Sequence, residues 1–256
     1  DKPLIFYPLS ILMLSKIKDI LIIVNKGQIN QYRKLIQDGK NLGIKITYQE
    51  QNKPKGLPDA FILGKNFIKK DNIALILGDN FFYGQSLTKT LLKCVKIKQG
   101  CRVILHKVTN PEKFGVAKVK NNKIKLIKEK PKRFISDLAI TGLYFFDNNV
   151  VKYSKNLKPS KRGELEITDL NKIYIQKGNL RLKEMSSGYT WLDMGTPKSL
   201  MEASNLIYTL EKRQGIKIGC PEEIALENNW ISSNELTKSI GNNLNEYNNY
   251  LLNKIS

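Results

Sequence analysis

Two aspartates occupy matching places in the sequence, each directly after a short apolar segment. Asp79 follows the apolar run 72–77 and Gly78, and Asp193 comes just before a Gly-Thr-Pro helix start at 195–197. In open α/β sheets, ligands bind outside the carboxyl ends of the strands. Mg²⁺ favours one or two carboxylates together with phosphate oxygens over an all-protein cage. We therefore interpret Asp79 and Asp193 as two ligands that converge on one Mg²⁺.

A plainer interpretation exists for each aspartate. Asp79 could close a turn or cap a helix, and Asp193 could match the dipole of the helix that begins near Thr196. The rest of the composition bears on this choice, because the chain has one histidine, His106, and three cysteines without a C-x-x-C pattern. A histidine-based metal site, a zinc site and a disulfide framework are therefore disfavoured, and the cysteine usage fits a reducing cytoplasm. Catalysis would have to rest on carboxylates, basic side chains and backbone groups.

Further polar residues lie at the ends of predicted strands. Lys130 could reach a phosphate and Glu129 could accept hydrogen bonds from a sugar hydroxyl, although both could equally belong to a solvated edge. Gly142 interrupts a strong strand, which indicates either close approach of a ligand or tight packing. Glu164 and Glu166 precede a helix, where acids complement the dipole.

Composition limits the class of protein. The chain has 256 residues, of which 41% are hydrophobic, enough for one sizeable core. No apolar run approaches the roughly 18 residues of a membrane span, which disfavours a membrane protein. The net charge of +20 could attract nucleic acid, but the basic residues are spread along the chain without forming blocks. We therefore interpret the basic residues first as solvated surface side chains, and second as groups that attract anionic substrates.

Hydrophobic periodicity predicts an α/β fold. Helices and strands alternate over the first hundred residues, which indicates a mostly parallel sheet with helices on both faces. The series begins with a helix, whereas a doubly wound fold normally begins with a strand. A hairpin is expected at 115–128 and short helices after Gly215. The predicted helices are 8–18, 29–37, 60–64, 86–98 (capped by Ser86), 148–157, 166–176, 196–210, 221–229, 233–240 and 245–252, and the strands are 20–24, 45–49, 72–77, 101–108, 138–146 and 180–185.

Several short motifs follow one another in an order that is more specific than any of them alone. In this order the chain resembles the nucleotidyltransferases that make nucleotide sugars, and it does so over essentially its whole length. The motifs are Q-N-K-P-K-G-L-P-D-A-F at 51–61, L-G-D-N at 77–80, F-G-V-A at 114–117, K-E-K-P at 128–131, T-G-L-Y-F-F-D at 141–147, K-P-S-K-R-G-E-L-E-I-T-D-L-N at 158–171 and W-L-D-M-G-T at 191–196.

The resemblance implies a Rossmann-like sheet with a sugar-binding half, and the branch of the family that joins dTTP and α-D-glucose 1-phosphate for rhamnose-type dTDP-sugar biosynthesis. It implies Mg²⁺ as cofactor, a cytoplasmic homotetramer, and no nucleic-acid or membrane partner. The implied residues are Asp79 and Asp193 for the metal and catalysis, Lys130 for catalysis and substrate binding, Gln51 and Gly56 for the base, and Gly115, Glu129, Thr141, Gly142, Tyr144 and Trp191 for the sugar phosphate.

One departure from the family pattern is large. The family has a glycine-rich loop after its first strand, G-G-x-G-T-R-L-x-P, and nothing in this chain matches it. We therefore expect residues 1–215 to form a core without that strand and loop, with impaired turnover, and residues 216–256 to form a helical extension. The alternative is a sugar-nucleotide-binding or regulatory protein without catalysis. At Pro58-Asp59 this chain also departs from the Ala-Gln that is common in the resembled enzymes.

Overall fold

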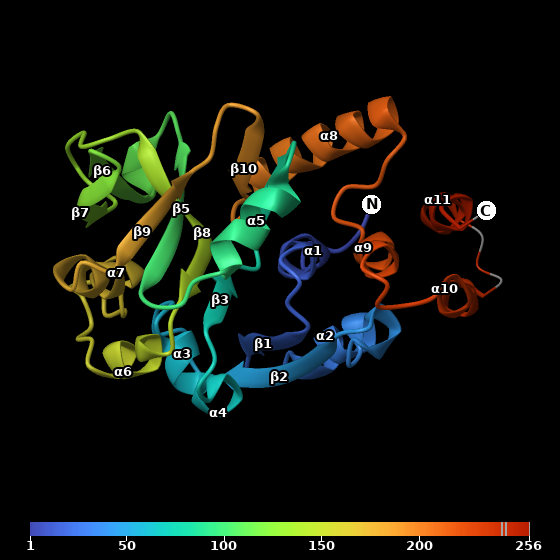
Figure 1. Ribbon diagram of the computed structural model, residues 1–256, viewed down its shortest axis with the longest axis horizontal. Coiled ribbons are helices and arrows are strands. Elements are labelled where there is room, and N and C mark those ends of the chain that lie inside the picture. The colour runs from blue at the N-terminus through green and yellow to red at the C-terminus, as the bar shows by residue number, and fades with distance from the viewer. Residues whose placement is uncertain (242, 244, 256) are drawn as a thin grey trace.

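The computed structural model describes residues 1–241, 243 and 245–255. It is an α/β structure in which helices surround a curled sheet (Figure 1), which confirms the predicted class. The sequence predicts a mostly parallel sheet, whereas the main sheet combines parallel and antiparallel pairs. The first element is a helix, which confirms the unusual helix-first order. The N-terminal elements are α1 (Phe6–Leu14), β1 (Asp19–Asn25), α2 (Ile29–Ile36), the short 3₁₀ helix η1 (Lys40–Leu42), β2 (Lys45–Gln51), α3 (Asp59–Leu63) and α4 (Lys65–Ile68).

The main sheet is built around a fully buried strand, β8. Its strand order is β7-β6-β8-β5-β9, and β3 also pairs with β8. All nine residues of β8 are buried, which explains why its sequence is almost continuously apolar instead of alternating. The pair β5–β9 is parallel, whereas β3, β5 and β6 run antiparallel to β8. The strands are β3 (Ile73–Ile76), β5 (Cys101–Lys107), β6 (Gly115–Lys120), β7 (Lys123–Glu129), β8 (Leu138–Phe146) and β9 (Leu180–Glu184).

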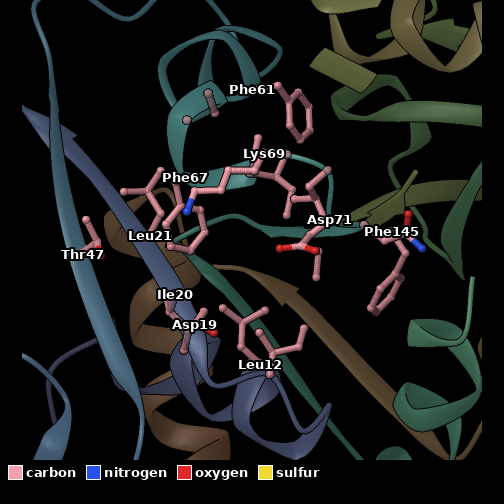
Figure 2. A pocket seen from close by; sticks show the side chains of 18 of the residues that line it. Leu12, Asp19, Ile20, Leu21, Thr47, Phe61, Phe67, Lys69, Asp71 and Phe145 are labelled. Carbon is pink, nitrogen blue, oxygen red and sulfur yellow. The ribbon is translucent and has the colours of Figure 1, made fainter. Parts of the chain in front are cut away.

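Two further pairs of strands lie beside this sheet. β1 and β2 form a parallel pair, and β4 (Asn80–Gly84) forms an antiparallel ribbon with β10 (Tyr189–Asp193). β1 pairs with β2, and β3 pairs with β8. A cavity of about 580 Å³ lies between β1 and β3, and its wall is mostly apolar, with Leu21, Phe61 and Phe145 among its lining residues (Figure 2).

The helices cover both faces of the sheet. At the start of α5 (Leu87–Val95), the expected cap is wrong. Ser86 was expected to cap this helix through its side chain, but it makes no such hydrogen bond. Its φ of 62° places it in the left-handed region, whereas a capping serine needs an extended backbone to reach the first amides. The other helices of this part are η2 (Pro111–Lys113), α6 (Asn149–Lys155) and α7 (Ile167–Gln176).

The C-terminal helices share a hydrophobic core with the N-terminal elements. Ile224, Leu236 and Leu251 belong to the same buried cluster as Leu9 and Met13 of α1. Figure 1 shows these helices on the side of the molecule that carries α1 and α2. They are α9 (Pro221–Glu227), α10 (Ser233–Ile240) and α11 (Glu246–Asn253). Residues 242, 244 and 256 of the predicted extension lie outside the described residues, and its boundary at residue 215 stays a prediction. No helix within the described ranges is both long and apolar enough to cross a membrane.

Helix α8 (Pro197–Gln214) begins with a capping box directly after the second aspartate motif. The Thr196 side chain accepts a hydrogen bond from the Ser199 amide, and the Ser199 side chain accepts one from the Thr196 amide. We expect Thr196→Ala to lower the free energy of unfolding by about 1 kcal/mol, because a helix amide loses its acceptor. Urea unfolding measures this loss. Ser204→Ala, an exposed change within the same helix, should shift stability by less than about 0.5 kcal/mol, and an equal loss in both variants would contradict the capping argument.

Candidate active site

The β4–β10 ribbon brings the two aspartate motifs together. Asp193 lies opposite Asn80 in the ribbon, and the Met194 amide donates a hydrogen bond of 2.8 Å to the Asp79 carbonyl. Both carboxylates face the same point: a Cβ placed on Gly195 would lie 3.0 Å from Asp193 Oδ1 and 3.0 Å from Asp79 Oδ2. The predicted convergence of the two side chains is therefore present in the structure.

The electrostatics of this pair favour a bound cation. Burial raises the pKa of the Asp193 carboxyl and the neighbouring charge of Asp79 raises it further, while the Gly195 amide and Lys130 act in the opposite direction. Within the described part of the chain, no group of three or more His, Cys, Asp or Glu side chains could hold a metal ion. A metal at this point would therefore have these two protein carboxylates and would need further oxygen ligands from substrate or water, which suits Mg²⁺.

Asn80 is a site residue that the sequence reasoning missed. Its side chain is 1% exposed. Its Oδ1 accepts hydrogen bonds from the Gly142 amide at 3.0 Å and from Trp191 Nε1 at 2.6 Å, and its Nδ2 donates to Asp79 Oδ1 at 2.9 Å. The available signal was its place next to Asp79 in Leu-Gly-Asp-Asn, but that signal does not say where the side chain points.

A second cluster forms around Glu129. Gly115 lies opposite Glu129 in the hairpin, and a Cβ on Gly115 would lie 3.1 Å from Glu129 Oε2 and 3.0 Å from Thr168 Cγ2. The Thr168 side chain also lowers the pKa of the Glu129 carboxyl. Burial, followed by the charge of Glu129, raises the pKa of the Tyr144 hydroxyl. The structure thus gathers Gly115, Glu129 and Tyr144, three of the predicted sugar-phosphate residues, with Thr168 as an unpredicted neighbour.

Two basic side chains stand near these clusters. Lys130 is exposed, and its positive charge acts on the pKa of both Asp193 and Glu129. Arg162 also acts on the pKa of Glu129 and forms ion pairs of 3.6 Å with Glu164 and with Glu166. Sequence reasoning did not single out Arg162 as a candidate site residue. The charge of Lys130 therefore acts on both the aspartate pair and the Glu129 cluster.

The two acids before α7 do not act as simple helix caps. Glu166 is the residue at the helix start, yet the structure gives it no capping hydrogen bond. Its carboxylate instead accepts a hydrogen bond from Ser160 Oγ at 2.8 Å and pairs with Arg162. Its charge also contributes to the raised pKa of Glu129. The turn therefore holds an arginine beside the Glu129 cluster.

Trp191 and Thr141 are both buried. The Trp191 ring is buried and packs against Phe114, with ring centres 5.1 Å apart, and edge-on against His106 at 6.2 Å. The Thr141 hydroxyl is fully buried and has no hydrogen-bond partner among the described residues. Buried hydroxyls are usually paired, so this oxygen is a candidate for contact with a bound molecule or water.

Gln51 and Gly56 lie on other segments than the aspartate pair. Gln51 ends β2, and its Nε2 donates to Asn25 Oδ1 at 3.1 Å. Gly56 has a φ of +100°, and a Cβ there would lie 2.1 Å from the Leu165 carbonyl oxygen. Close packing therefore explains the glycine, and its predicted contact with the base stays a prediction. The cavity of Figure 2 is lined by other residues than the predicted site residues, so it is separate from the candidate site.

The raised pKa of Glu129 predicts a pH effect on stability. Burial, and then the charge of Glu166, raise this pKa above its ordinary value of 4.5. The folded state then binds more protons than the unfolded state between the two pKa values, so stability falls as pH rises through this interval. We expect Glu129→Gln to be more stable than the wild type at pH 7 and to lose that advantage below about pH 4.

Urea unfolding of both proteins across this pH range measures the effect. Glu112→Gln, which removes an exposed carboxylate, is the matched control and should follow the wild-type curve. A stability difference that stays constant from pH 3 to pH 8, roughly the range in which a carboxyl group titrates, would show that ionisation of Glu129 does not cause it.

Comparisons with known proteins agree with the geometry. The model of the nucleotidyl transferase family matches residues 1–209. A glucose-1-phosphate thymidylyltransferase of Neisseria meningitidis is 46% identical over 256 residues, covering 98% of this chain and 88% of that protein. The corresponding enzyme of Xanthomonas campestris is 45% identical over 253 residues, covering 98% of this chain and 86% of that one.

Solved structures give the same result. A Bacillus anthracis protein described as a glucose-1-phosphate thymidylyltransferase superposes with a TM-score of 0.73 at 40% identity, covering 80% of this chain and 82% of that one. A UDP-glucose pyrophosphorylase superposes with a TM-score of 0.68 at 23% identity, covering 82% and 88%, and shows the fold alone. The predicted fold class and family are thereby confirmed, and the chain belongs to the nucleotidyl transferase family.

Proposed function

We propose that this protein transfers the thymidylyl group of dTTP to α-D-glucose 1-phosphate, giving dTDP-glucose and pyrophosphate. The observation that carries the proposal is the facing pair Asp79 and Asp193, which Lys130 connects electrostatically to the Glu129 cluster. Relatives 41–46% identical to this chain carry the name of that activity, which supports the choice of substrates.

In this reaction a phosphate oxygen of the sugar phosphate attacks the α-phosphorus of dTTP. The new P–O bond forms as the bond between the α-phosphorus and its bridging oxygen to the β-phosphorus breaks, and pyrophosphate leaves with that bonding electron pair. Catalysis of such a step rests on alignment and on neutralisation of charge. In the proposal, Lys130 and Arg162 hold the sugar phosphate, Glu129 accepts hydrogen bonds from sugar hydroxyls, and Trp191 limits the sugar pocket.

The carboxylate pair fits a divalent cation. Asp79 and Asp193 would hold Mg²⁺, because their oxygens face one point and their charges repel each other without a cation. When bound, Mg²⁺ neutralises charge on the phosphate oxygens. The protein's own part is to hold both carboxylates at that point, where the Gly195 backbone amide donates a hydrogen bond of 2.9 Å to Asp193 Oδ1.

Three parts of the proposal concern the rest of the chain. Gln51 and Gly56 would contact the thymine base, as the motif at 51–61 implies. The chain would assemble as a homotetramer, and the exposed apolar side chains of α8, Leu200, Met201 and Tyr208, support self-association. Residues 216–256 would act as an extension of the core 1–215.

A pyrophosphate-release assay with dTTP, glucose 1-phosphate and Mg²⁺ tests the proposal. Release that needs all three components supports it, and replacement of dTTP by CTP in a parallel reaction controls for the choice of base. Calorimetry with dTDP-glucose runs alongside. Tight binding of dTDP-glucose without any pyrophosphate release would contradict the enzymatic function and favour a sugar-nucleotide-binding protein.

A further inference from the structure

We propose that Asn80 is a positioning residue that couples the sugar side of the site to the metal side by fixing the Asp79 carboxylate. One oxygen of Asp79 is held by the Asn80 amide and the other is thereby left for the cation. The inference rests on the proposed function, because it assigns a role to Asn80 within the same site.

The orientation of the Asn80 amide follows from its partners. The Gly142 amide and Trp191 Nε1 can only donate hydrogen bonds, and both meet the same side of the Asn80 side chain, at 3.0 and 2.6 Å. The amide oxygen must therefore face them. The side chain is 1% exposed, so bulk water cannot easily replace either contact. The amide nitrogen is consequently directed at Asp79 Oδ1, 2.9 Å away.

This orientation divides the work of the two Asp79 oxygens. Oδ1 accepts the hydrogen bond from Asn80, and Oδ2 lies toward the point near Gly195 that Asp193 Oδ1 also faces. A hydrogen bond to the ligand oxygen that is not used by the metal orients a carboxylate, as outer partners of metal ligands generally do. The metal-facing geometry of Asp79 thus depends on a side chain that Trp191 holds from the opposite side.

Packing keeps the amide in place. A Cβ on Gly142 would lie 2.5 Å from Asn80 Oδ1 and 2.8 Å from its Nδ2, so the glycine leaves the space that the amide fills. The backbone N–H of Asn80 donates a hydrogen bond of 3.2 Å to the Leu77 carbonyl, and the Asn80 backbone pairs with that of Asp193 across the β4–β10 ribbon. Asn80 therefore has little freedom to turn, and a displacement of Trp191 would be passed on to Asp79.

Calorimetric titration with Mn²⁺ alone tests the inference on the full chain without substrates. Asn80→Ala is expected to weaken Mn²⁺ binding about tenfold, as loss of an outer partner of a metal ligand typically does. Trp191→Phe, which removes one donor that anchors the amide, should weaken it about threefold, a smaller loss because one anchor remains. Phe114→Leu is the matched control: it also changes a contact of the Trp191 ring, yet it leaves every hydrogen bond of Asn80 and should change Mn²⁺ affinity less than about twofold.

Each outcome separates the possibilities. Circular dichroism and thermal unfolding establish which variants are folded. If Asn80→Ala does not fold, the Mn²⁺ affinity of Trp191→Phe alone tests the role of Asn80. Mn²⁺ affinity in the folded variants equal to that of the wild type overturns the role of Asn80 and leaves the proposed function intact. An equal loss in Phe114→Leu and Trp191→Phe also overturns it, because packing would then be the cause. Absence of Mn²⁺ binding by the wild type overturns the carboxylate pair as a metal site, and the role of Asn80 with it.

Discussion

Asp193→Asn is expected to lower kcat for dTDP-glucose formation by about 10³-fold, because the site loses one of two carboxylates for the cation. Charge stabilisation by a metal ion is worth several kcal/mol in the transition state, and about 4 kcal/mol corresponds to this factor. Asp79→Asn should behave in the same way, since both oxygens face one point beside Gly195. The measurement is steady-state pyrophosphate release at saturating substrates over a range of Mg²⁺ concentrations.

Stability separates loss of function from loss of fold in this experiment. The pKa of Asp193 is raised in the folded state, above all by burial. Ionisation of Asp193 at neutral pH therefore lowers the free energy of unfolding. The stability that the protonated carboxyl contributes is lost as pH rises through the pKa of the folded state. Asp193→Asn should thus be at least as stable as the wild type at pH 7. The control is Asp169→Asn, which removes a carboxylate that is paired with Lys172 on the surface of α7. Turnover by Asp193→Asn within tenfold of the wild type would contradict the shared-metal interpretation.

Gly142→Ala is expected to lower the free energy of unfolding by about 2–3 kcal/mol, because its Cβ would overlap the buried Asn80 amide. The nearest atom, Asn80 Oδ1, would lie 2.5 Å away, and the hydrogen bonds to Trp191 and Asp79 would have to shift with it. Turnover should fall as well, since the same displacement moves Asp79. Urea unfolding and the pyrophosphate assay measure the two effects.

Gly188→Ala is the matched control for this substitution. A Cβ on Gly188 would meet nothing within 4 Å, so stability should change by less than about 0.5 kcal/mol. A Gly142→Ala protein with wild-type stability and turnover would show that the amide can move without cost, which would contradict the close packing around Asn80.

Most of the local structure could be predicted from sequence, because it depends on neighbours in the chain. Apolar residues at helical spacing predict α2 and α5, and the continuous apolar run 138–146 predicts β8. The Asn121-Asn122 turn predicts the β6–β7 hairpin, and both asparagines adopt positive φ. Ser86 is the exception, because its type is typical of a cap, while its left-handed backbone is set by the preceding turn.

The candidate site could be predicted in part. Asp79 and Asp193 were recognisable because Asp79 follows a strand, Asp193 ends one, and both belong to ordered motifs. Their convergence needed only that the β4–β10 ribbon brings them together. Asn80 was not recognisable, because its role depends on a partner far along the chain: Trp191 lies 111 positions after Asn80. Gly56 packs against Leu165, and its assignment to the base stays a prediction.

The sequence by itself therefore determined the family, the alternation of elements and the choice of the two aspartates as candidate metal ligands, since these depend on residue type and order. Only the tertiary structure decided that Asn80 faces Trp191 and Asp79, and that the charge of Lys130 lowers the pKa of both Asp193 and Glu129. The physical reason is that strand pairing and burial join distant segments. A buried amide must satisfy each donor and acceptor with whatever partner that pairing brings close.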